Sequence, residues 1–245
     1  KQEKDLNNQL WTAHLLETNP EAIIQAHYTY LQSGARCIIT SSYQASELAF
    51  TSMGYDTDKH KKLIVKSVQL AEEAINRFIT KNNINYKPMI AASIGPYGAY
   101  LADGSEYHGN YNVSDKELNE FHLSRIKLLD HSTADFFACE TIPSFQEAKV
   151  LSRIFKHTNK SAWVSFSCKD KCHLNDGSEI TKCALLFSNH PKIFAVGVNC
   201  TSPKYISGLI KSIKPILKAK KIVVYPNSGE IYNSETKTWI GLSED

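Results

Sequence analysis

The stretch that decides the fold is FAVGVNC, residues 194–200, in which five apolar or small residues end on an asparagine and a cysteine. A continuous apolar run of this kind predicts a strand buried on both faces, as in a parallel sheet covered by helices. Parallel α/β folds carry their functional side chains at strand ends. Cys200 is therefore a candidate functional group. Core filler is the alternative, because free cysteine is among the most buried residue types.

Five further apolar runs share this character and alternate with helical patterns. They lie at residues 36–43, 88–95, 135–141, 162–168 and 221–227. Between them, Asn19 and Pro20 are suited to begin a helix that ends at Gly34. Ser114 with Glu117 has the spacing of a capping box for another helix. The alternation predicts an α/β fold with a parallel sheet.

Polar or reactive side chains end nearly every run: Tyr43, Tyr97, Glu140, Lys169, Cys200 and Asn227. A (β/α)₈ barrel brings all its strand ends to one mouth, whereas an open sheet concentrates function at one switch point. We therefore predict a (β/α)₈ TIM barrel that forms a single domain over residues 1–245. Only six strands are counted, and an unclosed sheet would expose two apolar edges. The first and last barrel strands are thus expected to be missing from this chain.

Composition excludes several classes of function. The 28 basic and 25 acidic residues give a net charge of +3, which is too balanced to indicate a nucleic-acid partner. No apolar run approaches the ~20 residues that span a bilayer, and the first residues lack the apolar core of a signal peptide. The six cysteines have no spacing of a disulfide scaffold and fit free thiols. We expect a cytoplasmic protein with no membrane partner.

Two further features suggest a site. Residues 95–111 form a long loop with four tyrosines and four glycines, and tyrosine faces attract cations. A self-packed surface loop is the alternative. Glu140 sits in an apolar run, where a carboxylate is costly unless it binds something or forms a structural ion pair. The loop 225–230 offers N–H groups for an anion around Ser228 and Gly229, or is a plain turn.

Six segments taken in chain order resemble the homocysteine S-methyltransferases, especially the branch that uses S-methylmethionine. They are DLNNQLWTAHLLETNPEAI, ITSSYQAS, GPYGAYLADGSEYHGNY, CETIPSFQEA, GVNCTSP and VVYPNSGE, and the resemblance covers essentially all 245 residues. It implies a zinc-dependent (β/α)₈ enzyme. The implied reaction moves a methyl group from a sulfonium donor, S-methylmethionine or S-adenosylmethionine, to the zinc-bound thiolate of homocysteine, which forms methionine.

The resemblance also implies roles for residues. The GVNC cysteine, Cys200 here, is one of three thiolate ligands of Zn²⁺. The family's other two ligands form an adjacent pair that is absent from residues 1–245, so we expect them beyond residue 245. Glu140 corresponds to the group that binds a substrate ammonium, and Thr141 is placed to assist it. The remaining candidates are Tyr43, Tyr97 and Tyr100 for the sulfonium, and Asn227 and Ser228 for the amino-acid ends. No side chain beyond the metal site is assigned a catalytic role.

Two alternatives stay open at this point. Lys169, also at a strand end, would serve a Schiff-base lyase, which borohydride would trap with a carbonyl substrate. A chain without a metal site would instead be a binding module for amino acids or sulfonium compounds, because a fold does not fix a function.

Overall fold

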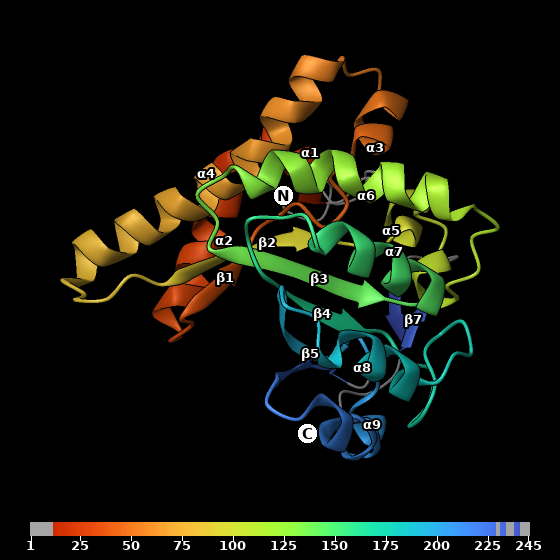
Figure 1. Ribbon diagram of the computed structural model, residues 1–245. Helices are drawn as coiled ribbons and strands as arrows, with labels where there is room; N and C mark the ends of the chain where they lie inside the picture. The colour runs from red at the N-terminus through yellow and green to blue at the C-terminus, as the bar shows by residue number, and fades with distance from the viewer. Residues whose placement is uncertain (1–11, 229–230, 234–237, 241–245) are drawn as a thin grey trace. The chain divides into compact units, whose positions relative to one another are not determined.

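The computed structural model describes residues 12–228, 231–233 and 238–240, and it has an α/β architecture (Figure 1). Its strands are β1 (Cys37–Ile39), β2 (Met89–Ile94), β3 (Phe136–Ile142), β4 (Ala162–Phe166), β5 (Ile193–Asn199), β6 (Lys221–Tyr225), β7 (Ile231–Asn233) and β8 (Thr238–Ile240). The first six occupy the six apolar runs of the sequence. The last two form an antiparallel hairpin that the apolar pattern does not indicate.

The first six strands form one sheet in the order β1-β2-β3-β4-β5-β6, so each strand lies beside its neighbour in the chain. The pairs β1–β2, β4–β5 and β5–β6 are parallel, as the alternation with helices predicts. Every residue of β4 is buried, and so are all but the first of β3. Continuous burial explains why these strands have no alternation of apolar and polar residues.

Helices connect the strands. They are α1 (Thr12–Thr18), α2 (Pro20–Gln32), α3 (Glu47–Ser52), α4 (Thr57–Asn82), α5 (Tyr97–Leu101), α6 (Asp115–Asp130), α7 (Phe145–Phe155), α8 (Ile180–Ser188) and α9 (Pro203–Leu217). The predicted caps are confirmed where the sequence places them. The Asn19 side chain accepts a hydrogen bond from Ala22 N at 3.2 Å, and Gly34 has the left-handed φ of 97° that favours glycine after a helix. Glu117 accepts from Ser114 N at 2.8 Å, which confirms the capping box.

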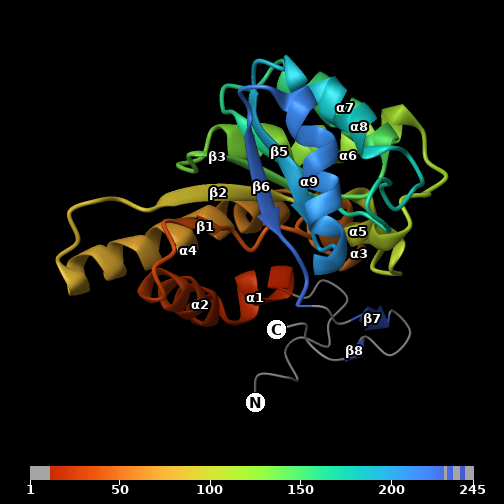
Figure 2. The ribbon, with the colours of Figure 1, turned by 90° about the horizontal axis from the view of Figure 1, so that it is seen from below.

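The chain divides into two compact units. The first comprises Lys1–Ile94 and Glu120–Ala138, and the second comprises Gly95–Asn119 and Cys139–Asp245. Strand β3 passes from one unit to the other. In the second unit, α8 and α9 pack against each other (Figure 2).

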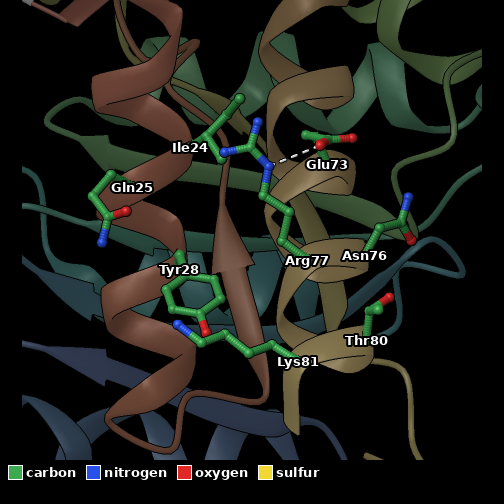
Figure 3. Close-up of a pocket in the computed structure, with 8 residues that line it drawn as sticks. All are labelled: Ile24, Gln25, Tyr28, Glu73, Asn76, Arg77, Thr80 and Lys81. Carbon is green, nitrogen blue, oxygen red and sulfur yellow. Dashed lines mark hydrogen bonds and ion pairs between the residues drawn. The ribbon is translucent and has the colours of Figure 1, made fainter. Parts of the chain in front are cut away.

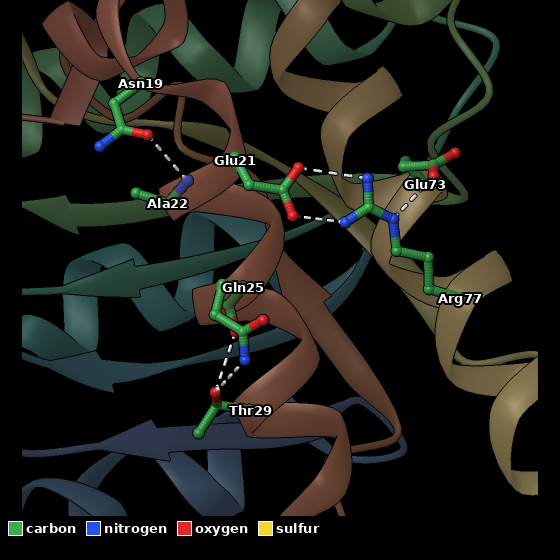
Figure 4. Close-up of polar contacts among 7 residues, drawn as sticks. All are labelled: Asn19, Glu21, Ala22, Gln25, Thr29, Glu73 and Arg77. Atoms are coloured by element: carbon green, nitrogen blue, oxygen red, sulfur yellow. Dashed lines mark hydrogen bonds and ion pairs between the residues drawn. The ribbon is translucent and has the colours of Figure 1, made fainter.

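In the first unit, α2 packs against α4. Arg77 on α4 donates to Glu21 of α2 through Nη1 and Nη2, and its Nε donates to Glu73 at 2.8 Å (Figure 4). A groove of about 560 Å³ runs between the two helices, and Tyr28 and Lys81 are among the residues that line it (Figure 3). Lys81 Nζ lies 5.6 Å from the centroid of the Tyr28 ring. The side chains of Arg77, Glu21 and Glu73 are exposed, so their ion pairs contribute little to stability.

Two findings bear on the expected environment of the protein. All six cysteines lie in the described part of the chain, and each is a free thiol, as predicted. None of the described helices combines the length and the apolar character that crossing a membrane requires.

A buried histidine makes the first unit sensitive to acid. His27 on α2 is 8% exposed, its Nε2 has no hydrogen-bond partner among the described residues, and burial lowers its pKa from 6.5 to about 4. Below pH 6.5 the unfolded chain protonates His27, whereas the folded chain keeps it neutral until the pH reaches about 4. The stability that comes from neutral His27 is therefore present above pH 6.5 and is lost as the pH falls to about 4.

We expect His27→Gln to remove about 3 kcal/mol of the difference in unfolding free energy between pH 7 and pH 4. Urea unfolding at both pH values checks this. The control His131→Gln, at an exposed histidine, should keep the wild-type difference. An unchanged difference in His27→Gln would contradict the assignment.

Candidate functional site

A cluster of polar side chains lies at the carboxyl ends of β3, β5 and β6 in the second unit. Glu140 lies inside β3, two residues before its end, and is only 8% exposed. The Tyr225 hydroxyl, from the last residue of β6, lies 3.0 Å from Glu140 Oε2, to which it donates. The same hydroxyl lies 2.8 Å from Ser165 Oγ on β4. A buried carboxylate is thus held in a fixed direction by the next strands of the sheet.

Thr141 and Cys200 form the centre of this cluster, and Asn199 joins them. Thr141 N donates to Asn199 Oδ1 at 2.7 Å, and Asn199 Nδ2 donates to Thr141 Oγ1 at 2.7 Å. Two donors also approach the Cys200 sulfur: Asn199 Nδ2 at 3.2 Å and the Thr141 hydroxyl at 3.7 Å. The side-chain amide of Asn199 therefore connects the end of β3 to the end of β5.

The backbone at this centre is strained. Thr141 has a φ of 62° and Cys200 a φ of 45°, both in the left-handed region. Side chains with a β carbon rarely adopt that region, and a β-branched threonine is a true outlier there. Such conformations persist where the surrounding structure enforces them, and they gather at functional sites. Two of them in contact mark this end of the sheet as the candidate site.

The hydrogen-bond donors around the Cys200 sulfur fit a thiolate that is bound to a metal. Burial, together with the charges of Glu140 and Glu106, raises the pKa of this thiol, while hydrogen bonds from Thr141 and Asn199 lower it. Those two donors would stabilise a sulfur that carries negative charge. Among the described residues, no group of three or more His, Cys, Asp or Glu side chains is arranged to hold a metal ion. The role of Cys200 as a metal ligand therefore stays a prediction.

The tyrosine-rich loop 95–111 is ordered by contacts within the second unit. It contains α5 and a short 3₁₀ helix (Ser105–Tyr107), elements that the sequence did not indicate. Tyr97 N donates to Glu147 Oε1 at 2.7 Å. The Tyr97 ring centroid lies 5.5 Å from that of Tyr100 and 5.5 Å from that of Tyr111. The loop thus carries a cluster of three packed tyrosine rings, and its role in binding a cation stays a prediction.

The other predicted site residues are distributed over the two units. Tyr43 belongs to the first unit, four residues after β1, and its carbonyl accepts from Arg125 at 3.4 Å. Lys169 is exposed. Asn227 N donates to Thr201 O at 3.1 Å, which holds the segment after β6 beside the residue that follows Cys200. Ser228 is exposed, and Gly229 lies outside the described residues.

Sequence reasoning missed four side chains of the site: Ser167, Asn199, Tyr225 and Glu106. Ser167, Asn199 and Tyr225 stand at or just beyond the ends of β4, β5 and β6. A search of every strand-end polar residue would have found these three. Glu106 lies in the middle of a loop, and nothing in the local pattern distinguishes it from the neighbouring Asp103.

Comparison with known proteins identifies the family. The model of the family described as homocysteine S-methyltransferase matches residues 1–245. The chain belongs to the homocysteine S-methyltransferase family. Family membership makes the protein a methyltransferase that acts on homocysteine, and it confirms the resemblance recognised in the sequence segments.

Individual relatives are similar over most of the chain. Homocysteine S-methyltransferase YbgG of Bacillus subtilis is 48% identical, over 98% of this chain and 77% of the relative. Homocysteine S-methyltransferase 3 of Zea mays is 41% identical, over 96% and 72%. The crystal structure of the metallated form of the homocysteine methyltransferase MmuM from Escherichia coli superposes with a TM-score of 0.86 at 39% identity, covering 91% of this chain and 78% of that one.

Proposed function

We propose that this family member transfers a methyl group from the sulfonium of S-methylmethionine to the thiol sulfur of homocysteine, and that S-adenosylmethionine is an alternative donor. The observation that carries the proposal is the cluster of Glu140, Thr141, Asn199, Cys200 and Tyr225 at the carboxyl ends of three strands. A sulfonium is already activated, since it leaves as a neutral thioether. The protein has mainly to align two sulfur atoms with the methyl group and to exclude water.

The reaction balances without a further reactant. The homocysteine sulfur, after losing its proton to solvent, attacks the methyl carbon and forms a new carbon–sulfur bond. The bond between that methyl carbon and the sulfonium sulfur breaks, and its electron pair stays on the donor. With S-methylmethionine, both products are methionine.

Zinc is the metal that we propose for this site. Cys200 would hold it, together with two cysteines that we predict beyond residue 245. When bound, zinc would supply the chemistry that converts a coordinated thiol to a thiolate at neutral pH. The Thr141 hydroxyl and the Asn199 amide would orient the Cys200 sulfur and stabilise its charge. The MmuM structure described as metallated supports a metal in this family.

Other predictions keep the status of proposals. We propose that the parallel sheet of six strands is part of an eight-stranded barrel in one domain, and that the protein acts in the cytoplasm on small molecules. Tyr97 and Tyr100 are proposed to contact the sulfonium, with Tyr43 as a further candidate; Asn227 and Ser228 would contact the amino-acid ends. Lys169 is exposed, away from the buried setting in which Schiff-base lysines work, so the lyase alternative gains no support.

Glu140 is proposed to bind the ammonium of homocysteine. Glu140→Gln keeps the shape and removes the charge, so we expect the KM for homocysteine to rise more than about tenfold with a smaller change in kcat. Tyr225→Phe removes only the hydroxyl that orients Glu140 and should raise the same KM by a few-fold. Steady-state kinetics of the full-length protein with S-methylmethionine measures both. An unchanged KM in Glu140→Gln would exclude Glu140 from the substrate site.

A further inference from the structure

Glu106 is a buried carboxyl group to which the proposed reaction gives no role. It lies in the 3₁₀ helix of the tyrosine-rich loop and is 6% exposed, and its Oε2 has no hydrogen-bond partner among the described residues. Burial, aided by the charge of Asp103, raises its pKa to about 7, against one hydrogen bond from its own N–H. Burying an unpaired carboxylate is costly, and proteins keep such groups where they bind a ligand.

The fold places the backbone of Glu106 beside the end of β3. Ser167 Oγ lies 3.4 Å from the carbonyl oxygen of Glu106 and 3.3 Å from that of Thr141, so one hydroxyl joins the loop to the end of β3. Asn175 Nδ2 donates to the same Oγ at 2.9 Å and fixes it. The loop that carries Glu106 is therefore fixed to the end of β3, where Glu140 and Thr141 lie.

Glu106 is also tied to the aromatic cluster. A β carbon on Gly98 would lie 2.3 Å from Glu106 N, so the helix turn that carries Tyr97 packs directly on the backbone of Glu106. This approach requires glycine at position 98. Aromatic faces and a carboxylate on one rigid loop are two groups that attract a cation. Glu140, in contrast, belongs to β3 and has Tyr225 as its partner.

We propose that the Glu106 carboxylate binds the positively charged sulfonium of the methyl donor. The inference rests on the proposed function, since it assigns the donor side of that site. In the transfer, the positive charge on the donor sulfur disappears, so a carboxylate beside it stabilises the bound donor more than the transition state. Glu106 then sets donor affinity and the preference for a charged sulfonium over a neutral thioether, without speeding the chemical step.

The test compares two ligands that differ in charge. S-Methylmethionine carries the sulfonium, and methionine has the same skeleton with a neutral thioether. In Glu106→Gln we expect the Kd for S-methylmethionine, measured by calorimetry on the full-length protein, to rise at least about tenfold. The Kd for methionine and the KM for homocysteine should stay within about twofold of wild type, and kcat at saturating donor should not fall.

Two further variants complete the design. Glu179→Gln removes an exposed carboxylate of the same unit and should leave every constant unchanged. Glu106→Met, which has a similar length and no charge, repeats the test if the glutamine variant does not fold. An unchanged Kd for S-methylmethionine overturns the inference. An equal loss of affinity for both ligands also overturns it, because it places Glu106 elsewhere than at the sulfonium. If the wild-type protein makes no methionine from homocysteine with either sulfonium donor, the proposed function fails instead.

Discussion

Cys200→Ser in the full-length protein is expected to lose both methyl transfer and bound metal. The serine hydroxyl does not ionise at neutral pH and is a poor ligand for zinc, although it keeps the hydrogen bonds from Asn199 and Thr141. Removing a group that only hydrogen-bonds to a metal ligand already lowers metal affinity or activity about 10–100-fold. Removing a ligand itself should therefore lower kcat/KM by more than about a hundredfold. Kinetics and elemental analysis of the purified protein measure the two effects.

A matched variant separates the role of Cys200 from a general loss of thiols. Cys172 is an exposed free cysteine in the same unit, and Cys172→Ser should keep both the metal content and the activity. Full activity in Cys200→Ser would show that this sulfur is no ligand. Full metal content with lost activity would place the metal elsewhere in the protein.

Gly197→Ala is expected to have the largest effect on stability. Gly197 on β5 pairs with Val223 on β6, and a β carbon at this position would lie 1.7 Å from the Val223 carbonyl oxygen. The nearest atoms are all backbone, so no side-chain rotation relieves the overlap and the strands must separate. Overpacking in a core typically costs 1–3 kcal/mol, and we expect more than about 3 kcal/mol here. The midpoint of urea unfolding measures it.

The same strand offers a control. Ala195→Gly removes a methyl group from a buried position on β5 and should cost only about 1 kcal/mol. Gly197→Ala should also impair activity in any fraction that folds, because Tyr225 follows Val223 by two residues and orients Glu140. Stability of Gly197→Ala within about 1 kcal/mol of wild type would contradict the close approach of β5 and β6.

The order of strands and helices along the chain follows from local patterns in the sequence. The six apolar runs coincide with β1 to β6, and the caps at Asn19 and Ser114 form as the sequence indicates. Local chemistry accounts for this success, because a cap or a buried strand depends on residues within a few positions of each other. The short helix α5 and the hairpin β7–β8 were missed for the converse reason. They have too few residues to show a period.

The features of the candidate site also fall into two groups, those that the sequence indicates and those that only the structure shows. Cys200 and Glu140 were recognisable because a thiol and a carboxylate stand out in apolar runs at strand ends, and the family segments lie around them. The sequence by itself therefore determined the parallel α/β class and the family, and it indicated these two residues as candidates. Only the tertiary structure decided that Thr141 and Cys200 adopt left-handed backbone and that Tyr225 reaches Glu140. It also decided that Oε2 of the buried Glu106 has no hydrogen-bond partner among the described residues. Those features arise from contacts between residues 26 to 85 positions apart, such as Ser167 with Thr141 and Tyr225 with Glu140, whose energies no local pattern contains.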